Sequence, residues 1–398
     1  MPRLYIKGIG MMAGLIIGAG VFALPYAYSQ AGVFWGTVHL AASLFIVYLL
    51  HQWYGEVSFY TKGKHRFVGY VEMYLGKKAK FFSMLTTIGA YYGSLLVYAI
   101  MGGIFLANFT SLFNGQTVFF LTLLFFAAGG LMALFKVSRI AEINFYLTMP
   151  IIGFIIYLLF FSFPHIKAEN FFSAGNLLFN KNWFLPYGVW LFSLTGFSAI
   201  PPMRDIFINL PVKNFKRVIS ISLFLAVIAY AIFIFSVLGV SGSLTTVDAL
   251  SGIKGAMGAK VMAIGSIIGF LAVFTSFIAL AVDMKSMFRY DYKIHRFPAW
   301  LLAVVPPVVL YLYFYLRNVD NLVNILAIIG SVGMGILGIF IVLMRHKIVK
   351  ILKAGDKDDV VAEIDSREIK IRKKLEIIIL IGIISAVLYD IWNIVSKL

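Results

Sequence analysis

The feature that most constrains the fold of this chain is a series of long apolar runs that continues from one end to the other. Runs of about 20 apolar residues are long enough to cross the hydrocarbon core of a bilayer as helices. The composition agrees, because 61% of the 398 residues are hydrophobic and only 13% are charged, about half the charged share of a soluble domain. We therefore expect an all-α integral membrane protein that lies in the lipid bilayer.

The apolar runs predict about eleven spans, at 7–30, 34–57, 82–109, 117–135, 141–163, 183–203, 217–240, 260–282, 298–316, 321–344 and 375–396. Lys and Arg fall mostly in alternate connecting segments, which hold 28 of the 34 such residues. Cytoplasmic loops are enriched in these residues, so we expect the N-terminus in the cytoplasm and the C-terminus outside. The net charge of +17 has the same explanation and does not indicate a nucleic-acid partner. We expect a multi-pass protein of the cell membrane.

Residues 18–25 read GAGVFALP, which puts two glycines and a proline inside the first apolar run. Gly costs about 1 kcal/mol and Pro about 3 kcal/mol in a helix interior, so this helix is expected to break. Within a bilayer, backbone groups that a break sets free are tolerated only where they line a cavity or are buried in protein. The break therefore predicts a binding site, with the unwound part at 17–21.

A second copy of the pattern begins 176 residues later, where residues 196–201 read GFSAIP and residues 20–25 read GVFALP. Each copy lies in the first span of a block of five, so the two blocks cross the membrane in opposite directions. Matched interrupted helices in two inverted halves mark the binding site in many transporters. A plainer alternative is that Gly10, Gly14 and Gly18 only pack helices together and that the prolines only kink them.

The two blocks define the domain organisation that we expect. The transporter core covers 1–344, with one repeat at 7–163 and the other at 183–344. Residues 345–374 mix both charge signs and are expected to form an amphipathic cytoplasmic linker to the eleventh helix at 375–396.

The first break resembles the first-span signature of the amino acid–polyamine–organocation superfamily. Residues 192–201, FSLTGFSAIP, are similar to the sixth-span pattern of its amino acid/auxin permease and aromatic amino acid permease branches. The resemblance implies the LeuT-type fold, with two inverted five-helix repeats and broken first and sixth helices. It also implies secondary active transport of amino acids, in which spans 1, 2, 6 and 7 rock against spans 3, 4, 8 and 9. Phe197 departs from the pattern, because relatives often carry His there.

The same resemblance implies a site for a zwitterionic amino acid. Half-helix N-termini offer N–H groups to the carboxylate, and unwound carbonyls accept from the ammonium. No Lys, Arg, Asp or Glu lies in the middle of a predicted span, which favours a neutral substrate, either aromatic or branched. The residues expected around it are Ala19, Gly20, Val21 and Tyr98 for the carboxylate, Ile16, Thr195 and Phe197 for the ammonium, Phe22 and Phe197 near the side chain, and Gly196 and Ser198 in the same unwound segment.

The coupling ion is suggested by the eighth span, where the A-x-x-T-S pattern at 272–276 is similar to part of a LeuT-type sodium site. The resemblance implies sodium ligands from Ala272, Thr275 and Ser276, completed by the carbonyls of Gly14 and Ile17 in the first span. Membrane-helix Thr and Ser also bond carbonyls of their own helix, so the pattern does not exclude a proton-coupled permease. The titratable candidates for that alternative are His39, His51 and Glu56 in the second span.

We expect a secondary active transporter that imports neutral amino acids by cation symport, with sodium slightly favoured over protons. A membrane-embedded enzyme fits less well, because His65, Glu72, Glu142 and Asp205 are too scattered to form a catalytic set. A channel or a non-transporting sensor is not excluded by the pair of breaks. The chain has no Cys, and no cofactor is expected besides the coupling ion. Neither the exact substrate nor the oligomeric state follows from the sequence.

Overall fold

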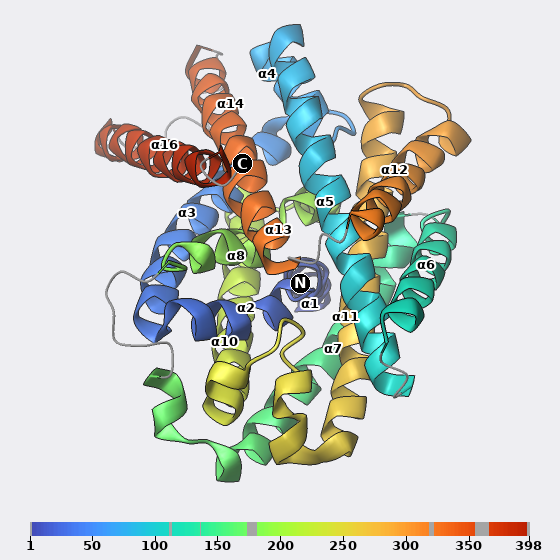
Figure 1. Ribbon diagram of the computed structural model, residues 1–398. Coiled ribbons are helices and arrows are strands. Elements are labelled where there is room, and N and C mark those ends of the chain that lie inside the picture. The colour runs from blue at the N-terminus through green and yellow to red at the C-terminus, as the bar shows by residue number, and fades with distance from the viewer. Residues whose placement is uncertain are drawn as a thin grey trace.

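The computed structural model describes residues 2–110, 114–135, 137–172, 181–317, 322–354 and 366–395, and the regular structure in these ranges is helical (Figure 1). The longer elements are α1 (Pro2–Ile16), α2 (Gly20–Ala31), α3 (Val33–Tyr60), α4 (Phe67–Leu75), α5 (Lys77–Thr110), α6 (Gly115–Met132), α7 (Val137–Ser162), α8 (Leu185–Leu194), α9 (Ile200–Phe207), α10 (Val212–Ser241), α11 (Lys254–Tyr290), α12 (Arg296–Leu316), α13 (Leu322–Ile328), α14 (Gly335–Ala354) and α16 (Ser366–Val395).

The helices confirm the prediction of an all-α membrane protein. Among the described residues, eight helices are long and apolar enough to cross a bilayer, and the bent pair α1–α2 adds a ninth candidate. The predicted spans at 141–163 and 183–203 are helical as well, and they correspond to α7 and to the short pair α8 and α9. The first and sixth spans are therefore both interrupted, as their glycine and proline residues indicate.

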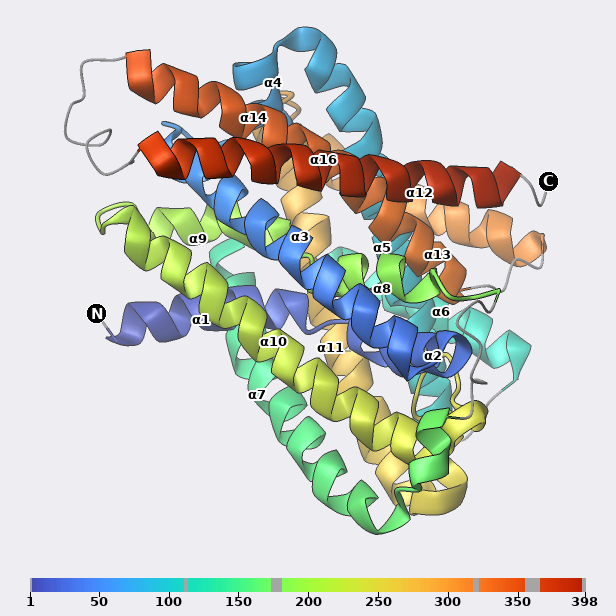
Figure 2. The same cartoon turned by 90° about the vertical axis from the view of Figure 1, so that its left-hand side faces the viewer.

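The two interrupted spans run in opposite directions, as the inverted repeat requires. In Figure 2, α1 lies to the left of α2, whereas α8 lies to the right of α9. The same view shows that α1 begins at one end of the bundle and that α16 ends at the other. An odd number of crossings gives this arrangement of the two ends.

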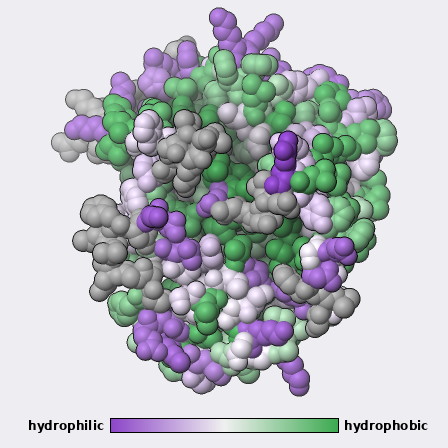
Figure 3. All heavy atoms as spheres, in the orientation of Figure 1, coloured by the Kyte–Doolittle hydropathy of each residue, from purple (hydrophilic) through white to green (hydrophobic). Residues whose placement is uncertain are grey.

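Large apolar side chains face outward on the peripheral helices α6 and α12. Phe120 and Leu124 on α6 are 66% and 58% exposed, and Val309 and Leu316 on α12 are 58% and 78% exposed. Figure 3 shows hydrophobic side chains along much of the right-hand rim of the molecule, on the side where Figure 1 places these helices. In water such a rim would be unfavourable, whereas in lipid it is the expected surface.

The segment after the tenth span is more helical than a separate linker would be. Helix α14 continues to Ala354, and α16 begins at Ser366. The predicted linker at 345–374 therefore starts within α14 and ends within α16, and its centre at 355–365 lies outside the described residues.

Buried ion pairs fasten the eleventh helix to the core. Glu56 on α3 accepts hydrogen bonds from Lys216 Nζ on α10 (2.7 Å) and from Arg345 Nε on α14 (3.0 Å). Arg345 also donates to Glu376 on α16 (2.6 Å), and its guanidinium lies 4.7 Å from the ring centroid of Trp53. The Arg345 side chain is only 2% exposed, so its charge depends on these partners. We call these four charged residues the Arg345 cluster.

Removing Arg345 should destabilise the fold markedly. Arg345→Met leaves two buried carboxylates without their shared cation, and breaking a buried pair in this way costs about 3–5 kcal/mol. We expect a clearly lower melting temperature for the purified protein in detergent. Lys373→Met, an exposed cation near the start of α16, is the matched control and should melt like the wild type. Equal melting temperatures for the two variants would contradict the role of the Arg345 cluster.

Candidate functional site

The first span breaks between the end of α1 at Ile16 and the start of α2 at Gly20, with a bend of 47°. Across the break, the Gly18 N–H donates to the Ile16 carbonyl (2.8 Å) instead of continuing the helical pattern. Among the described residues, the carbonyls of Gly14 and Ile17 accept no backbone hydrogen bond across the break. The N–H groups of Ala19 and Gly20 likewise find no backbone acceptor in this part of the chain. The break thus sets free both acceptors and donors.

The sixth span breaks between the end of α8 at Leu194 and the start of α9 at Ile200. The N–H group of Gly196 donates to Nε2 of His51 on α3 (2.9 Å), so a side chain replaces the lost helical acceptor. The Thr195 carbonyl accepts no backbone hydrogen bond within the described ranges. This second break therefore also leaves a carbonyl available.

The two breaks lie directly against each other. A Cβ atom added to Gly20 would lie 2.7 Å from the Cα of Ser193, which is closer than side-chain carbons pack against backbone. Glycine at position 20 therefore allows α2 and α8 to approach to backbone contact. Gly18 has a similar role, because a Cβ there would overlap the hydroxyl oxygen of Ser276 on α11.

A small cavity of about 30 Å³ lies beside the two breaks. This volume holds about two water molecules and is too small for an amino acid. Four of the predicted substrate residues line it, namely Tyr98, Thr195, Phe197 and Ser198. The lining residues outside the predicted set are Leu15, Tyr54, Phe67, Tyr91, Ser94, Phe192, Leu280, Met334 and Leu337.

The three tyrosines of the third span have different surroundings. The Tyr91 hydroxyl donates to Asp283 Oδ2 (2.9 Å), and the Tyr92 hydroxyl donates to the Leu302 carbonyl (2.5 Å). The Tyr98 hydroxyl has no hydrogen-bond partner among the described residues, and its ring lies 6.0 Å from that of Phe192. Tyr98 is therefore the one of the three whose hydroxyl remains available beside the cavity.

The other predicted substrate residues lie at the breaks but do not line the cavity. Phe22 is fully buried, with its ring 4.7 Å from that of Phe105 and 5.4 Å from that of Phe233. Val21 is also buried, and its N–H donates to the Gly18 carbonyl (3.3 Å). These side chains shape the helix packing around the site.

The tenth span contributes two cavity residues that the apolar pattern did not reveal. Met334 ends a π-helical segment at Ile329–Met334, and Leu337 follows in α14. The segment packs closely on α8, because a Cβ added to Gly330 would overlap the carbonyl oxygen of Gly188. π-helical turns often occur at functional sites. The only local signal was the density of glycines after residue 329.

Of the predicted cation ligands in the eighth span, Ser276 lies against the first break. The Ser276 hydroxyl is fully buried without a hydrogen-bond partner and lies against Gly18. The Thr275 hydroxyl donates to the Ala272 carbonyl (3.1 Å) within its own helix and keeps its oxygen lone pairs. Buried polar atoms are usually hydrogen-bonded, so the Ser276 hydroxyl has unused bonding capacity at this site.

The three titratable candidates of the second span all take part in hydrogen bonds or ion pairs. His51 is fully buried, with Nδ1 2.7 Å from the Val47 carbonyl. Because Nε2 accepts from the Gly196 N–H, the proton of the neutral ring must lie on Nδ1. His39 lies near the other end of α3, where Nε2 is 3.0 Å from the Trp183 carbonyl. Glu56 belongs to the Arg345 cluster and is held by two cations.

An ion pair separates the cavity from one end of the bundle. Arg66, in the segment between α3 and α4, lies with Nε 2.8 Å from Asp283 Oδ1. The other oxygen of Asp283 accepts from Tyr91, which lines the cavity. Arg66 itself lines a space of about 540 Å³ on the far side. We call the Arg66–Asp283 pair the partition.

The Arg66 segment is anchored by a second carboxylate. Asp291 Oδ1, just beyond α11, accepts from the Arg66 N–H (3.2 Å). Burial raises the pKa of Asp291 to about 6, although hydrogen bonds from the backbone of Arg66 and Gly69 and the charges of Arg66 and Lys80 oppose the rise. The segment is thus held at both its backbone and its side chain.

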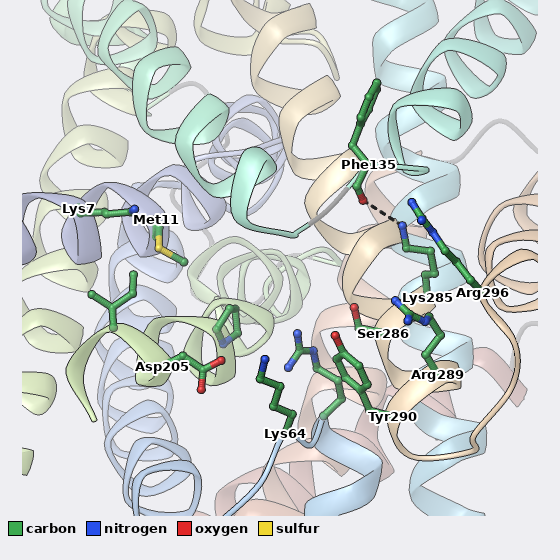
Figure 4. A pocket seen from close by; sticks show the side chains of 13 residues that line it. Lys7, Met11, Lys64, Phe135, Asp205, Lys285, Ser286, Arg289, Tyr290 and Arg296 are labelled. Carbon is green, nitrogen blue, oxygen red and sulfur yellow. Dashed lines mark hydrogen bonds between the residues drawn. The ribbon is translucent and has the colours of Figure 1, made fainter. Parts of the chain in front are cut away.

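The space beyond the partition is strongly basic. In Figure 4, Lys7, Met11 and Asp205 lie on one side of it, and Lys285, Arg289, Tyr290 and Arg296 lie on the other. Six of its described lining residues are cationic and one, Asp205, is acidic; the cations are Lys7, Lys64, Arg66, Lys285, Arg289 and Arg296. We call this space the basic vestibule.

A second space, of about 670 Å³, opens toward the α2 end of the bundle. Tyr26, Asn108, Asp248 and Lys254 are among the residues that line it. Asn108 on α5 donates to Asp248 (2.9 Å), which links the third span to the segment before α11. Spaces on both sides of a small central cavity fit a transporter in which access to a central site alternates between the two sides.

Comparison with known proteins agrees with this architecture. The chain is similar to MhsT, whose structure was solved in complex with L-phenylalanine, with a TM-score of 0.75, 18% identity and coverage of 96% of this chain and 98% of that chain. It is also similar to Mhp1, a nucleobase-cation-symport-1 family transporter, with a TM-score of 0.68, 13% identity and coverage of 97% and 90%. A manganese transporter from Eremococcus coleocola matches with a TM-score of 0.57, 12% identity and coverage of 99% and 95%. No curated protein matches the sequence significantly.

These likenesses confirm the predicted LeuT-type fold. The family follows from a second comparison. The sequence model of the tryptophan/tyrosine permease family matches residues 2–350, which include both breaks and the eighth span. The match confirms the predicted superfamily resemblance, and it makes the protein a transporter and not an enzyme. The chain belongs to the tryptophan/tyrosine permease family and is an aromatic amino acid permease.

Proposed function

We propose that this permease imports aromatic amino acids together with a cation, by alternating access around the paired breaks, and that the cation is sodium. The observation that carries the proposal is the buried, unpartnered Ser276 hydroxyl, which lies against Gly18 in the break that leaves the Gly14 and Ile17 carbonyls without backbone donors. The family match supports the aromatic substrate class, and the MhsT structure with L-phenylalanine is consistent with it.

The substrate carboxylate would bind at the start of α2. The N–H groups of Ala19 and Gly20 lack backbone acceptors and lie at the positive end of that half-helix. The Tyr98 hydroxyl, free beside the cavity, supplies a third donor. A carboxylate held by neutral donors needs no fixed cation in the membrane interior.

The ammonium and the aromatic ring would lie toward the sixth and tenth spans. The Thr195 carbonyl has no backbone donor in the described ranges and can accept from the ammonium. The Ile16 carbonyl is a weaker candidate, because it already accepts from Gly18 and from the Tyr230 hydroxyl. Phe192 and Met334 give the cavity an apolar wall for the ring, and they must move to admit it, because the cavity holds only about 30 Å³.

The cation would lie beneath the substrate, between the first and eighth spans. Carbonyl oxygens of Gly14 and Ile17 and hydroxyl oxygens of Thr275 and Ser276 form a set without a carboxylate, and Ala272 adds a carbonyl. Unwound carbonyls and half-helix ends are common sodium ligands in transporters of this architecture. Binding there would stabilise the break at Gly18.

Release would require the partition to open. The Arg66–Asp283 pair and the Tyr91 hydroxyl lie between the cavity and the basic vestibule. On the other side, the Asn108–Asp248 hydrogen bond joins elements around the second vestibule. Alternating access would open one of these sides at a time.

Removal of the Ser276 or Thr275 hydroxyl should weaken sodium dependence. In proteoliposomes that take up radiolabelled tryptophan or tyrosine, we expect Ser276→Ala and Thr275→Ala each to raise the sodium concentration for half-maximal uptake about tenfold, because one contact to a charged group contributes about 1.5 kcal/mol. Thr122→Ala is the control, since that buried hydroxyl lies in the fourth span and donates to the Val118 carbonyl of its own helix (2.8 Å). Uptake that needs no sodium and collapses with a protonophore would exclude sodium coupling.

The Tyr98 hydroxyl should matter for substrate affinity. Loss of one hydrogen bond to a carboxylate costs about 1.5 kcal/mol, so Tyr98→Phe is expected to raise the KM for tryptophan or tyrosine about tenfold. Tyr92→Phe removes a hydroxyl from the neighbouring surface of the same helix, where it only contacts the Leu302 carbonyl. The proposal for Tyr98 is wrong if both variants keep the wild-type KM.

Proton coupling is the second candidate, and the position of His51 favours it. A proton added at Nε2 would break the hydrogen bond from Gly196 and so release the sixth-span break. If His51 carries the coupling proton, His51→Gln should keep substrate binding but lose accumulation driven by a pH gradient. His39→Gln, on the same helix, is the control. If a sodium gradient alone drives equal accumulation of the amino acid by the wild type, His51→Gln and His39→Gln, His51 does not carry the coupling proton.

A further inference from the structure

One buried hydroxyl joins the two breaks. Tyr230 on α10 is fully buried, and its Oη lies 2.5 Å from the Ile16 carbonyl oxygen and 2.8 Å from the Ser193 carbonyl oxygen. Ile16 is the last residue of α1, and Ser193 is the next-to-last residue of α8. The hydroxyl therefore lies where the C-terminal ends of both half-helices meet.

This meeting point is electrostatically negative. Each helix C-terminus carries about half a negative elementary charge, together with carbonyls that lack helical donors. In transporters with interrupted helices, such ends commonly bind a cation. Here the Tyr230 hydroxyl proton is shared between the two carbonyls, and the site has no exposure to solvent.

The contrast with the Ser276 position is informative. There, a buried hydroxyl has no partner and two backbone carbonyls have no backbone donor in the described ranges. At Tyr230, the Ile16 carbonyl already has two donors, because it accepts from Gly18 as well. The position at Ser276 thus has oxygen atoms that could bind a cation, whereas the position at Tyr230 is occupied by the tyrosine hydroxyl.

We propose that the Tyr230 hydroxyl holds the two half-helix ends together in place of a second cation, so that each transport cycle moves one cation charge with one amino acid. The inference rests on the proposed cation symport and adds its stoichiometry. It does not depend on whether the cation is sodium or a proton, because either carries one charge with a zwitterionic substrate.

The packing around Tyr230 favours hydrogen bonds that persist throughout the transport cycle. Its ring lies 5.9 Å from that of Trp190 on α8, and the Trp190 indole N–H donates to the Gly36 carbonyl on α3 (3.1 Å). The first, second, sixth and seventh spans are thus joined around one point. If these four spans move as one body, the Tyr230 hydrogen bonds need not break during the movement.

The charge moved per substrate tests the proposal directly. Wild-type protein in proteoliposomes is held at defined membrane potentials with valinomycin and potassium gradients, and the potential at which net flux of radiolabelled tryptophan or tyrosine reverses is measured. We expect one charge per amino acid. Two charges would overturn the role of Tyr230 while leaving symport intact. No coupled charge would overturn both this inference and the proposed symport.

A variant provides an independent readout. Tyr230→Phe leaves two buried carbonyls open to a cation, so we expect uptake to need more of the coupling cation and its concentration dependence to become steeper, with a Hill coefficient rising from about 1 toward 2. Tyr187→Phe is the matched control, because the Tyr187 hydroxyl on α8 is buried without a hydrogen-bond partner. A folded Tyr230→Phe protein with wild-type cation dependence would overturn the inference. If the variant does not fold, the charge moved per amino acid by the wild-type protein decides whether the inference holds.

Discussion

A backbone group that loses its helical partner inside a membrane must find another one, and this requirement governs the centre of the structure. Two helices are interrupted side by side, and side chains from two other helices form hydrogen bonds with backbone groups at the breaks. His51 on α3 accepts from the sixth-span break, and Tyr230 on α10 donates to both breaks. Ser276 on α11 lies against Gly18 with its hydroxyl unused. Residues of the second, seventh and eighth spans therefore contact the breaks, and the cavity lies beside them.

Sequence alone could predict the breaks, because glycine and proline disfavour a helix wherever they occur. The family resemblance also implied Tyr98 and Thr195, and both line the cavity. Tyr54 and Met334 could not be found in the same way. A helix that is apolar on all sides gives no signal of its rotation, and the π-helical turn before Met334 depends on close packing against a helix far away in the sequence. Phe22 was predicted near the substrate side chain, yet it packs against Phe105 and Phe233 and does not line the cavity.

Glu56 illustrates a more general limit. A carboxylate near the end of a membrane span has two ordinary explanations, a proton carrier or a member of an ion pair. Only the fold distinguishes them, because the partner Arg345 lies 289 residues away. The same cluster explains how the eleventh helix is attached at one end, while near its other end the Tyr389 ring lies 5.5 Å from Trp183 and 4.5 Å from Phe184. The helix is thus fastened at two separated points beside an interrupted span.

The basic vestibule has a consequence for the kinetics of ion movement. Among its described lining residues are six cations and one carboxylate, and although Arg66 is paired with Asp283, the remaining charge of the walls is positive and disfavours small cations. A cation that approaches the partition from this side meets a repulsive field, while the carboxylate of an amino acid meets an attractive one. In the proposed cation symport, such a field would slow the encounter of a cation with the partition from this side and speed that of the substrate carboxylate, and it would leave the equilibrium of transport unchanged.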